Sequence, residues 1–118
     1  MIIILVILIL INIVVKFSTK ENEINPLGIS ILKVSSNSME PHFYRNDYIL
    51  IKQEDDYNVG DIITYKTEDS CLITHRIIEK YKNGFITKGD NNNIQDEKQV
   101  CINDVLGKEI YIFRTAGK

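Results

Sequence analysis

Three segments of this 118-residue chain carry side chains that together could cleave a peptide bond. The first holds Ser38, the second holds His75, and the third holds two carboxylates, Asp90 and Asp96. A serine hydroxyl is a weak nucleophile at neutral pH and needs a neighbouring base, which in turn needs a group that orients it. Ser38, His75 and either aspartate supply these three roles, so the sequence indicates hydrolysis through a serine nucleophile.

The local sequences around these residues resemble those of type I signal peptidases. They read Ser-Asn-Ser-Met-Glu-Pro at 36–41, Ile-Thr-His-Arg-Ile at 73–77 and Lys-Gly-Asp-Asn-Asn at 88–92. Their order and gaps are similar to those of the endoplasmic-reticulum and archaeal branch, which some Gram-positive bacteria also carry. That branch has histidine as the base, whereas the better-known bacterial branch has lysine. The resemblance runs from about residue 35 to residue 107.

The resemblance assigns a role to each candidate site residue. Ser38 is expected to be the nucleophile, His75 the base and Asp96 the residue that orients the imidazole. Ser36 is expected to add a hydroxyl to the oxyanion hole, beside the backbone N–H of Ser38. Asp90 is the second acidic position of the branch, and it either takes the orienting role or braces its own loop.

Each of these residues also has a structural interpretation. Ser38 could simply shape a turn before Pro41, and the aspartates could cap turns. His75 lies between isoleucines, where a core histidine with satisfied hydrogen bonds would also fit. The same surroundings favour a neutral imidazole, which suits a general base. His42, close to Ser38 in sequence, is a weaker candidate for the base.

The chain after residue 28 is rich in isoleucine, valine, tyrosine and threonine in short runs, which is typical of β-strands. The sequence therefore predicts a mostly β fold, and the resemblance implies the signal-peptidase/LexA-like β-fold. A Lys-Asn-Gly sequence at 82–84 predicts a hairpin with a type I′ turn. Asn37 and Asn46 stand where related sequences commonly have glycine, and asparagine tolerates the positive φ that glycine would adopt. The predicted strands are 29–35, 48–52, 62–66, 72–80, 85–88 and 106–113.

The N-terminus predicts a membrane anchor. Residues 1–15 are apolar except for Asn12, which gives about 22 Å of helix against a hydrocarbon core of about 30 Å. Phe17 can extend this helix and Lys16 can snorkel to the interface. We therefore predict an anchor at 1–17, a linker at 18–28 and a β-rich peptidase domain at 29–118. A cleaved signal peptide is the alternative for the first segment.

The resemblance also implies the partners and location of the protein. It implies a single-pass protein of the cell membrane, with its catalytic domain on the extracytoplasmic face, that cleaves signal-peptide-bearing precursors after small residues. Lys16 and Lys20 follow the apolar segment, and the positive-inside rule favours the opposite orientation, so the two arguments conflict. The net charge of −2 and the lack of a basic cluster argue against nucleic-acid binding.

The cysteines do not indicate a metal site, and there are two alternatives to signal-peptide cleavage. Cys71 and His75 would lie about 13 Å apart on a strand, too far for a shared metal ion, and no cofactor is expected. Cys71 and Cys101 are either free or joined in one disulfide. The chain lacks the serine–lysine pair of autoproteolytic repressors. A membrane-anchored β-module that binds exported peptides without cutting them is the alternative to an enzyme.

Overall fold

The computed structural model describes residues 2–19 and 28–115, with side chains at 2–10 and 28–115. One helix precedes seven strands and a single 3-10 turn. The elements are α1 (Ile2–Thr19), β1 (Ile29–Lys33), β2 (Tyr48–Lys52), β3 (Ile62–Lys66), β4 (Leu72–Tyr81), β5 (Gly84–Lys88), β6 (Val100–Cys101), η1 (Ile102–Asp104) and β7 (Val105–Phe113).

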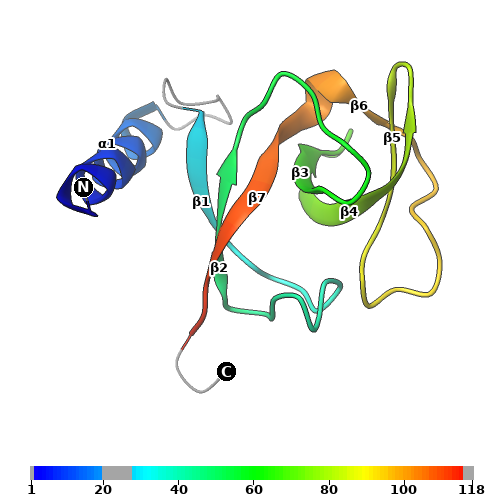
Figure 1. Ribbon diagram of the computed structural model, residues 1–118, viewed down its shortest axis with the longest axis horizontal. Coiled ribbons are helices and arrows are strands. Elements are labelled where there is room, and N and C mark those ends of the chain that lie inside the picture. Colours follow the sequence, from blue (N-terminus) through cyan, green and yellow to red (C-terminus); the bar gives the residue numbers. More distant parts are fainter. Residues whose placement is uncertain (1, 20–27, 116–118) are drawn as a thin grey trace.

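All seven strands form one antiparallel sheet in the order β1-β2-β7-β3-β4-β5-β6. The last strand of the chain, β7, lies between β2 and β3 and pairs with both. Figure 1 shows α1 beside β1, on the far side of the sheet from β5 and β6. The prediction of a mostly β fold is confirmed.

Six strands lie where the β-branched and aromatic runs predict them, within two residues at each end. Strand β6 was not predicted, because two residues are too few to show an alternating pattern. A hairpin joins β4 to β5 as expected, but its turn residues are Lys82 and Asn83, and Gly84 already pairs with Tyr81. In the described chain the non-glycine residues with positive φ are Asn46 and Ser70. The type I′ turn predicted at this hairpin is therefore wrong.

Gly84 is required for a different reason from the one predicted. A Cβ atom at this position would lie 2.4 Å from the carbonyl oxygen of Val100 on β6. The glycine thus allows β6 to approach β5. Asn46 has a φ of 76° and takes the left-handed conformation expected of a residue that replaces glycine. Asn37, in contrast, does not have a positive φ.

Two apolar cores lie on opposite faces of β3. Ile62 packs into one and Ile63 into the other, since neighbouring side chains of a strand point to opposite faces. The Ile62 core includes Met39 and Phe43 from the loop between β1 and β2. The Ile63 core includes Ile77 from β4. The loop that carries Ser38, the predicted nucleophile, is thus attached to one core, while the strand of the predicted base is attached to the other.

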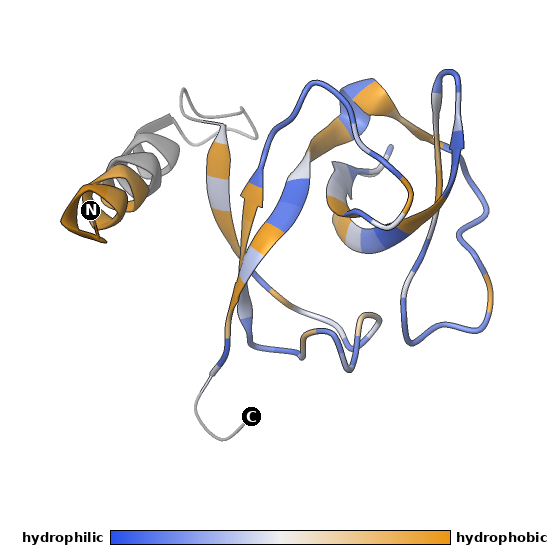
Figure 2. Ribbon diagram, in the orientation of Figure 1, coloured by the Kyte–Doolittle hydropathy of each residue, from blue (hydrophilic) through white to orange (hydrophobic). Residues whose placement is uncertain are grey.

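Residues 2–10 of α1 are all apolar and give the orange part of the helix ribbon in Figure 2. Most of them are exposed, from Ile2 at 77% to Leu8 at 37%. Ile9 and Leu10 line a small apolar cavity with Tyr48 and neighbouring residues of the sheet. Within the described residues, no helix combines the length and the hydrophobicity that crossing a membrane requires. The single-pass anchor predicted at 1–17 is therefore not supported.

Some residues of the three predicted segments lie outside the described residues. These are residue 1 of the predicted anchor, residues 20–27 of the predicted linker and residues 116–118 of the predicted peptidase domain.

Candidate active site

Ser38 lies in the turn that follows β1, with its hydroxyl directed toward β4. Two contacts fix this turn from the loop after β5: the backbone N–H of Asn91 donates to the Ser38 carbonyl oxygen at 2.8 Å, and the Asn91 side chain donates to the Asn37 carbonyl at 3.0 Å. Met39, the next residue of the turn, is 1% exposed and packs into the Ile62 core. The backbone of the turn is thus held by the loop after β5, and these contacts do not use the Ser38 hydroxyl.

His75 connects Ser38 to Asp96. Its Nε2 lies 3.1 Å from Ser38 Oγ, and its Nδ1 lies 2.6 Å from Asp96 Oδ2. An ionised carboxylate only accepts hydrogen bonds, so Nδ1 donates to Asp96, and Nε2 is left to accept the Ser38 proton. Segments that are far apart in the sequence therefore form one continuous chain of hydrogen bonds.

His75 shares one face of β4 with Ile73 and Ile77, because side chains of a strand alternate between its faces. His75 lies opposite Ile63 on β3, and it is 8% exposed, with Ile77 of the same face fully buried. The imidazole thus lies on a strand face shared with apolar side chains. Both of its ring nitrogens have hydrogen-bond partners. The histidine is a buried core residue and also a member of the hydrogen-bonded chain.

Asp96 stands in the loop between β5 and β6, and its carboxylate has further partners. Oδ2 accepts from the Thr87 hydroxyl at 2.6 Å and from the Tyr65 hydroxyl at 3.1 Å. Burial raises the pKa of Tyr65 to about 12, so this hydroxyl keeps its proton and remains a donor at physiological pH. Asp96, of the two candidate aspartates, is the one that contacts the imidazole.

Asp90 has a separate partner. Arg76 donates to it from Nε at 2.9 Å and from Nη2 at 2.7 Å, a bidentate pair. These hydrogen bonds hold the pKa of Asp90 below its usual value and raise the pKa of Arg76. The backbone N–H of Asp90 also donates to the sulfur of Met39. Asp90 thus joins its loop to β4 through Arg76.

Ser36 lies beside the predicted nucleophile. Its Oγ is 3.1 Å from Ser38 Oγ, and it accepts the Ser38 backbone N–H at 3.4 Å. The two groups predicted to form an oxyanion hole thus lie together at one side of the Ser38 hydroxyl. His42, the weaker candidate for the base, contacts Glu109 instead, at 2.8 Å.

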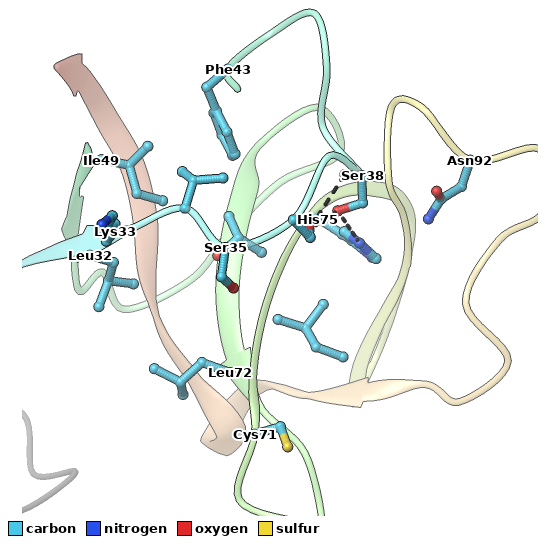
Figure 3. Close-up of a pocket in the computed structure, with 14 residues that line it drawn as sticks. Leu32, Lys33, Ser35, Ser38, Phe43, Ile49, Cys71, Leu72, His75 and Asn92 are labelled. Atoms are coloured by element: carbon cyan, nitrogen blue, oxygen red, sulfur yellow. Dashed lines mark hydrogen bonds between the residues drawn. The ribbon is translucent and has the colours of Figure 1, made fainter. Parts of the chain in front are cut away.

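A groove of about 690 Å³ opens at Ser38 and His75 (Figure 3). One wall is the end of β1 with the residues that follow it, and the other wall is the beginning of β4. Figure 3 shows Ser38 and His75 at one end of the groove and Leu72 and Cys71 toward the other. The lining residues are mostly apolar or small: Leu32, Lys33, Val34, Ser35, Ser36, Ser38, Phe43, Ile49, Cys71, Leu72, Ile73, Thr74, His75 and Asn92.

Residues 2–19 and 28–115 contain no group of three or more histidine, cysteine or acidic side chains placed to hold a metal ion. Cys71 and Cys101 are both free and exposed, so the disulfide alternative is not realised. Phe43, one of the aromatic residues near the nucleophile, is buried in the core.

Four residues at the site have no role in the sequence-based assignment: Tyr65, Arg76, Thr87 and Asn91. One signal was available for two of them. Thr87 and Tyr65 both lie in strand segments rich in apolar residues and are buried, and a polar group at such a position must find a buried partner. The partners themselves depend on strand pairing, which the sequence does not specify.

Comparison with known proteins supports the motif assignment. The family model described as "Peptidase S24-like" matches residues 12–115. Signal peptidase I W of Bacillus subtilis (strain 168) is 36% identical over 107 residues, which cover 83% of this chain and 56% of that protein. The signal peptidase complex catalytic subunit SEC11C of Homo sapiens is 40% identical over 74 residues, 56% of this chain and 38% of that protein.

A third relative is the signal peptidase complex catalytic subunit SEC11 of Debaryomyces hansenii, 34% identical over 65% of this chain and 55% of that protein. The chain thus spans about half, or less, of the length of these relatives. The family match covers most of the chain and includes every residue of the hydrogen-bonded site. The chain therefore belongs to the Peptidase S24-like family, and its relatives confirm the resemblance to type I signal peptidases that its motifs indicate.

Proposed function

We propose that this chain is a serine endopeptidase that removes N-terminal signal peptides from exported precursors, cutting after small residues. The observation that carries the proposal is the continuous chain from Asp96 through His75 to Ser38, which ends in an open groove. The names of its relatives, signal peptidase I and signal peptidase complex catalytic subunit, support the choice of substrate.

In the proposed reaction Ser38 Oγ attacks the scissile carbonyl carbon while its proton passes to His75 Nε2. The carbonyl oxygen becomes an oxyanion that accepts hydrogen bonds from the Ser36 hydroxyl and from the Ser38 N–H, which exchanges its 3.4 Å contact with Ser36 Oγ for the oxyanion. His75 then gives the proton to the leaving amine, and an acyl-enzyme remains. Water, activated by the same imidazole, hydrolyses the ester. Asp96 keeps Nδ1 protonated and stabilises the imidazolium.

The groove supports an extended substrate. Its two walls come from the end of β1 and the beginning of β4, and an extended peptide between them can take up backbone hydrogen bonds. Its small and apolar lining suits the uncharged residues before the cut. The sequence resemblance supplies the preference for small side chains.

We also propose that residues 1–17 attach the chain to a membrane, with residues 18–28 as the linker and the β-rich domain at 29–118 on the extracytoplasmic side. The exposed apolar side chains of α1 support this attachment. Accessory subunits are a further proposal, supported by the word "complex" in the names of two relatives.

The test is cleavage of a secretory precursor in detergent or lipid, with the cut site read by mass spectrometry. The intact chain should cut after a small residue, and Ser38→Ala should abolish cutting. Asp96→Asn should remove most of the activity, whereas the matched Asp55→Asn, at an exposed position outside the site, should retain it. Combining Ser38→Ala with Asp96→Asn should cost little more than Ser38→Ala alone, because the groups act as one unit.

No cutting by the folded intact chain would contradict the proposal and favour a module that binds exported peptides without cleaving them. Cutting that persists in Ser38→Ala would exclude Ser38 as the nucleophile.

A further inference from the structure

The orienting carboxylate is held by the sheet and not by its own loop. Residues 89–99, between β5 and β6, contain no helix or strand, so the loop alone does not fix a side chain. All of the hydrogen-bond partners described for Asp96 lie on strands. The backbone N–H of Asp96 donates to the Thr87 carbonyl at 2.8 Å, and its Oδ2 accepts from Thr87, Tyr65 and His75.

These donors converge on a single oxygen from three neighbouring strands. Tyr65 is on β3, His75 on β4 and Thr87 on β5. Tyr65 lies opposite Ile73, and Thr87 lies opposite Ile77, so both hydroxyl residues share the face of His75. The two hydroxyls are 3.2 Å apart. The position of Oδ2 is therefore fixed by the spacing of three paired strands.

Thr87 is better placed than Tyr65 to control this position. It is fully buried, whereas Tyr65 is 6% exposed, and its hydrogen bond to Oδ2 is 2.6 Å against 3.1 Å for Tyr65. A β-branched side chain is restricted about χ1, so the direction of the Thr87 hydroxyl follows from the strand. Thr87 also binds the backbone of Asp96, so it holds this residue at two points.

We propose that Thr87, assisted by Tyr65, is a positioning residue that fixes the Asp96 carboxylate against His75, an inference that rests on the proposed peptidase function. Without the Thr87 hydroxyl, Asp96 is held by one fewer donor and its contact with Nδ1 loosens. The imidazole then loses the restraint on its tautomer and orientation. Neither Thr87 nor Tyr65 lines the groove, so the loss should fall on the chemical step and leave substrate binding intact.

The decisive variants are Thr87→Val, which keeps the shape and removes the hydroxyl, and Thr87→Ser, which keeps the hydroxyl. Steady-state cleavage of a precursor peptide should show that Thr87→Val lowers kcat about tenfold, which corresponds to a loss of about 1.4 kcal/mol. KM should stay within about twofold. Thr87→Ser should recover most of kcat, and Tyr65→Phe should lower kcat by a smaller factor.

A second measurement does not depend on peptidase activity. The Nδ1 proton of His75, bonded to Asp96 at 2.6 Å, should give a low-field resonance in the proton NMR spectrum, assigned by its loss in His75→Gln. This resonance should be present in the intact chain and in Thr87→Ser. In Thr87→Val it should broaden or disappear through exchange with water, while the unfolding midpoint shows that the domain remains folded.

The outcomes separate this inference from the proposed function. If the intact chain does not cut any precursor, the proposed function is wrong. The NMR resonance then tests by itself whether Thr87 positions Asp96. If the intact chain cuts and Thr87→Val has the same kcat and an unchanged resonance, the inference is wrong while the function stands. A rise in KM together with no rescue by serine would also overturn it. If Thr87→Val does not fold, Tyr65→Phe must lower kcat at constant KM, and an unchanged kcat refutes the proposal.

Discussion

Asp47 offers a sharp test of how the residues after β7 are attached to the loop between β1 and β2 that carries Ser38. The carboxylate is fully buried. Its Oδ2 accepts the Tyr44 N–H at 2.8 Å and Arg114 Nη1 at 3.4 Å, and its Oδ1 accepts the N–H and hydroxyl of Thr115 at 3.2 and 3.4 Å. Arg114 also donates to the carbonyl of His42. One carboxylate thus joins the residues after β7 to the loop before β2.

The perturbation is Asp47→Asn, which keeps the shape but turns one acceptor oxygen into a donor. Whichever oxygen is replaced, two hydrogen bonds are lost, at about 1 kcal/mol each, and donors remain buried without an acceptor, at a cost of about 1 kcal/mol more. We expect the free energy of unfolding to fall by about 3 kcal/mol, which is a large share of the ~5–15 kcal/mol that typically stabilises a domain.

The effect should depend on pH in a defined direction. Burial alone would raise the pKa of Asp47, but hydrogen bonds from Tyr44 and Thr115 and the charge of Arg114 outweigh it and lower the pKa below 3.8. A depressed folded-state pKa means that the stabilisation is complete above the unfolded pKa and is lost as the pH falls through the folded pKa. The difference between the intact chain and Asp47→Asn should therefore shrink below about pH 3.8.

The assay is urea unfolding of the full chain, followed by circular dichroism between pH 3 and pH 7. Asp56→Asn is the matched control, because Asp56 is exposed and its ion pair with Lys80 lies at the surface; it should leave the midpoint nearly unchanged. Equal midpoints for Asp47→Asn and Asp56→Asn at pH 7, or a stability difference that grows on acidification, would refute the reasoning.

Two other predictions concern the loop after β5. Asp90→Asn removes the bidentate contact with Arg76 and should lower kcat/KM for precursor cleavage by about tenfold, as expected for about 1.4 kcal/mol; an unchanged kcat/KM would show that the brace is dispensable. Gly89→Ala places a Cβ atom 2.7 Å from the Ser38 carbonyl oxygen, so it should displace the nucleophile turn and lower kcat by more than about tenfold, measured beside an unfolding curve; wild-type kcat would contradict this close approach.

The strands and the three motif residues follow from local features of the sequence. Strand geometry puts His75 and Ile77 on one face of β4, and the motif order marks Ser38 as the candidate nucleophile, but both faces carry apolar residues and only the structure shows that this face is the buried one. The sequence also limits the orienting carboxylate to Asp90 or Asp96. In the structure Asp96 contacts His75 Nδ1 and Asp90 contacts Arg76, and these contacts depend on the course of the β5–β6 loop, which local patterns do not specify.

Other features depend on pairing between distant segments, which local patterns do not encode. Gly84 reads as a turn residue because it follows asparagine, but its role is set by Val100, sixteen residues away in the chain. Thr87 reads as an ordinary strand residue, and its partner is a loop carboxylate. At the N-terminus the apolar composition predicts a membrane-spanning helix, but no helix of the described residues is long and apolar enough to cross a membrane.

The central place of β7 has a consequence for the order in which the proposed site can assemble. Ser38 follows β1 and belongs with β2, whereas His75 and Asp96 belong with β3, β4 and β5, and β7 joins the two groups. During synthesis the nucleophile and the base are both made before the strand that brings their halves together. Long-range pairing of this kind forms late, because it must close a long loop first. A growing chain that has not reached Val105 therefore holds Ser38 and the His75–Asp96 pair on two parts of the sheet that are not yet joined, and the proposed site is complete only once β7 is paired.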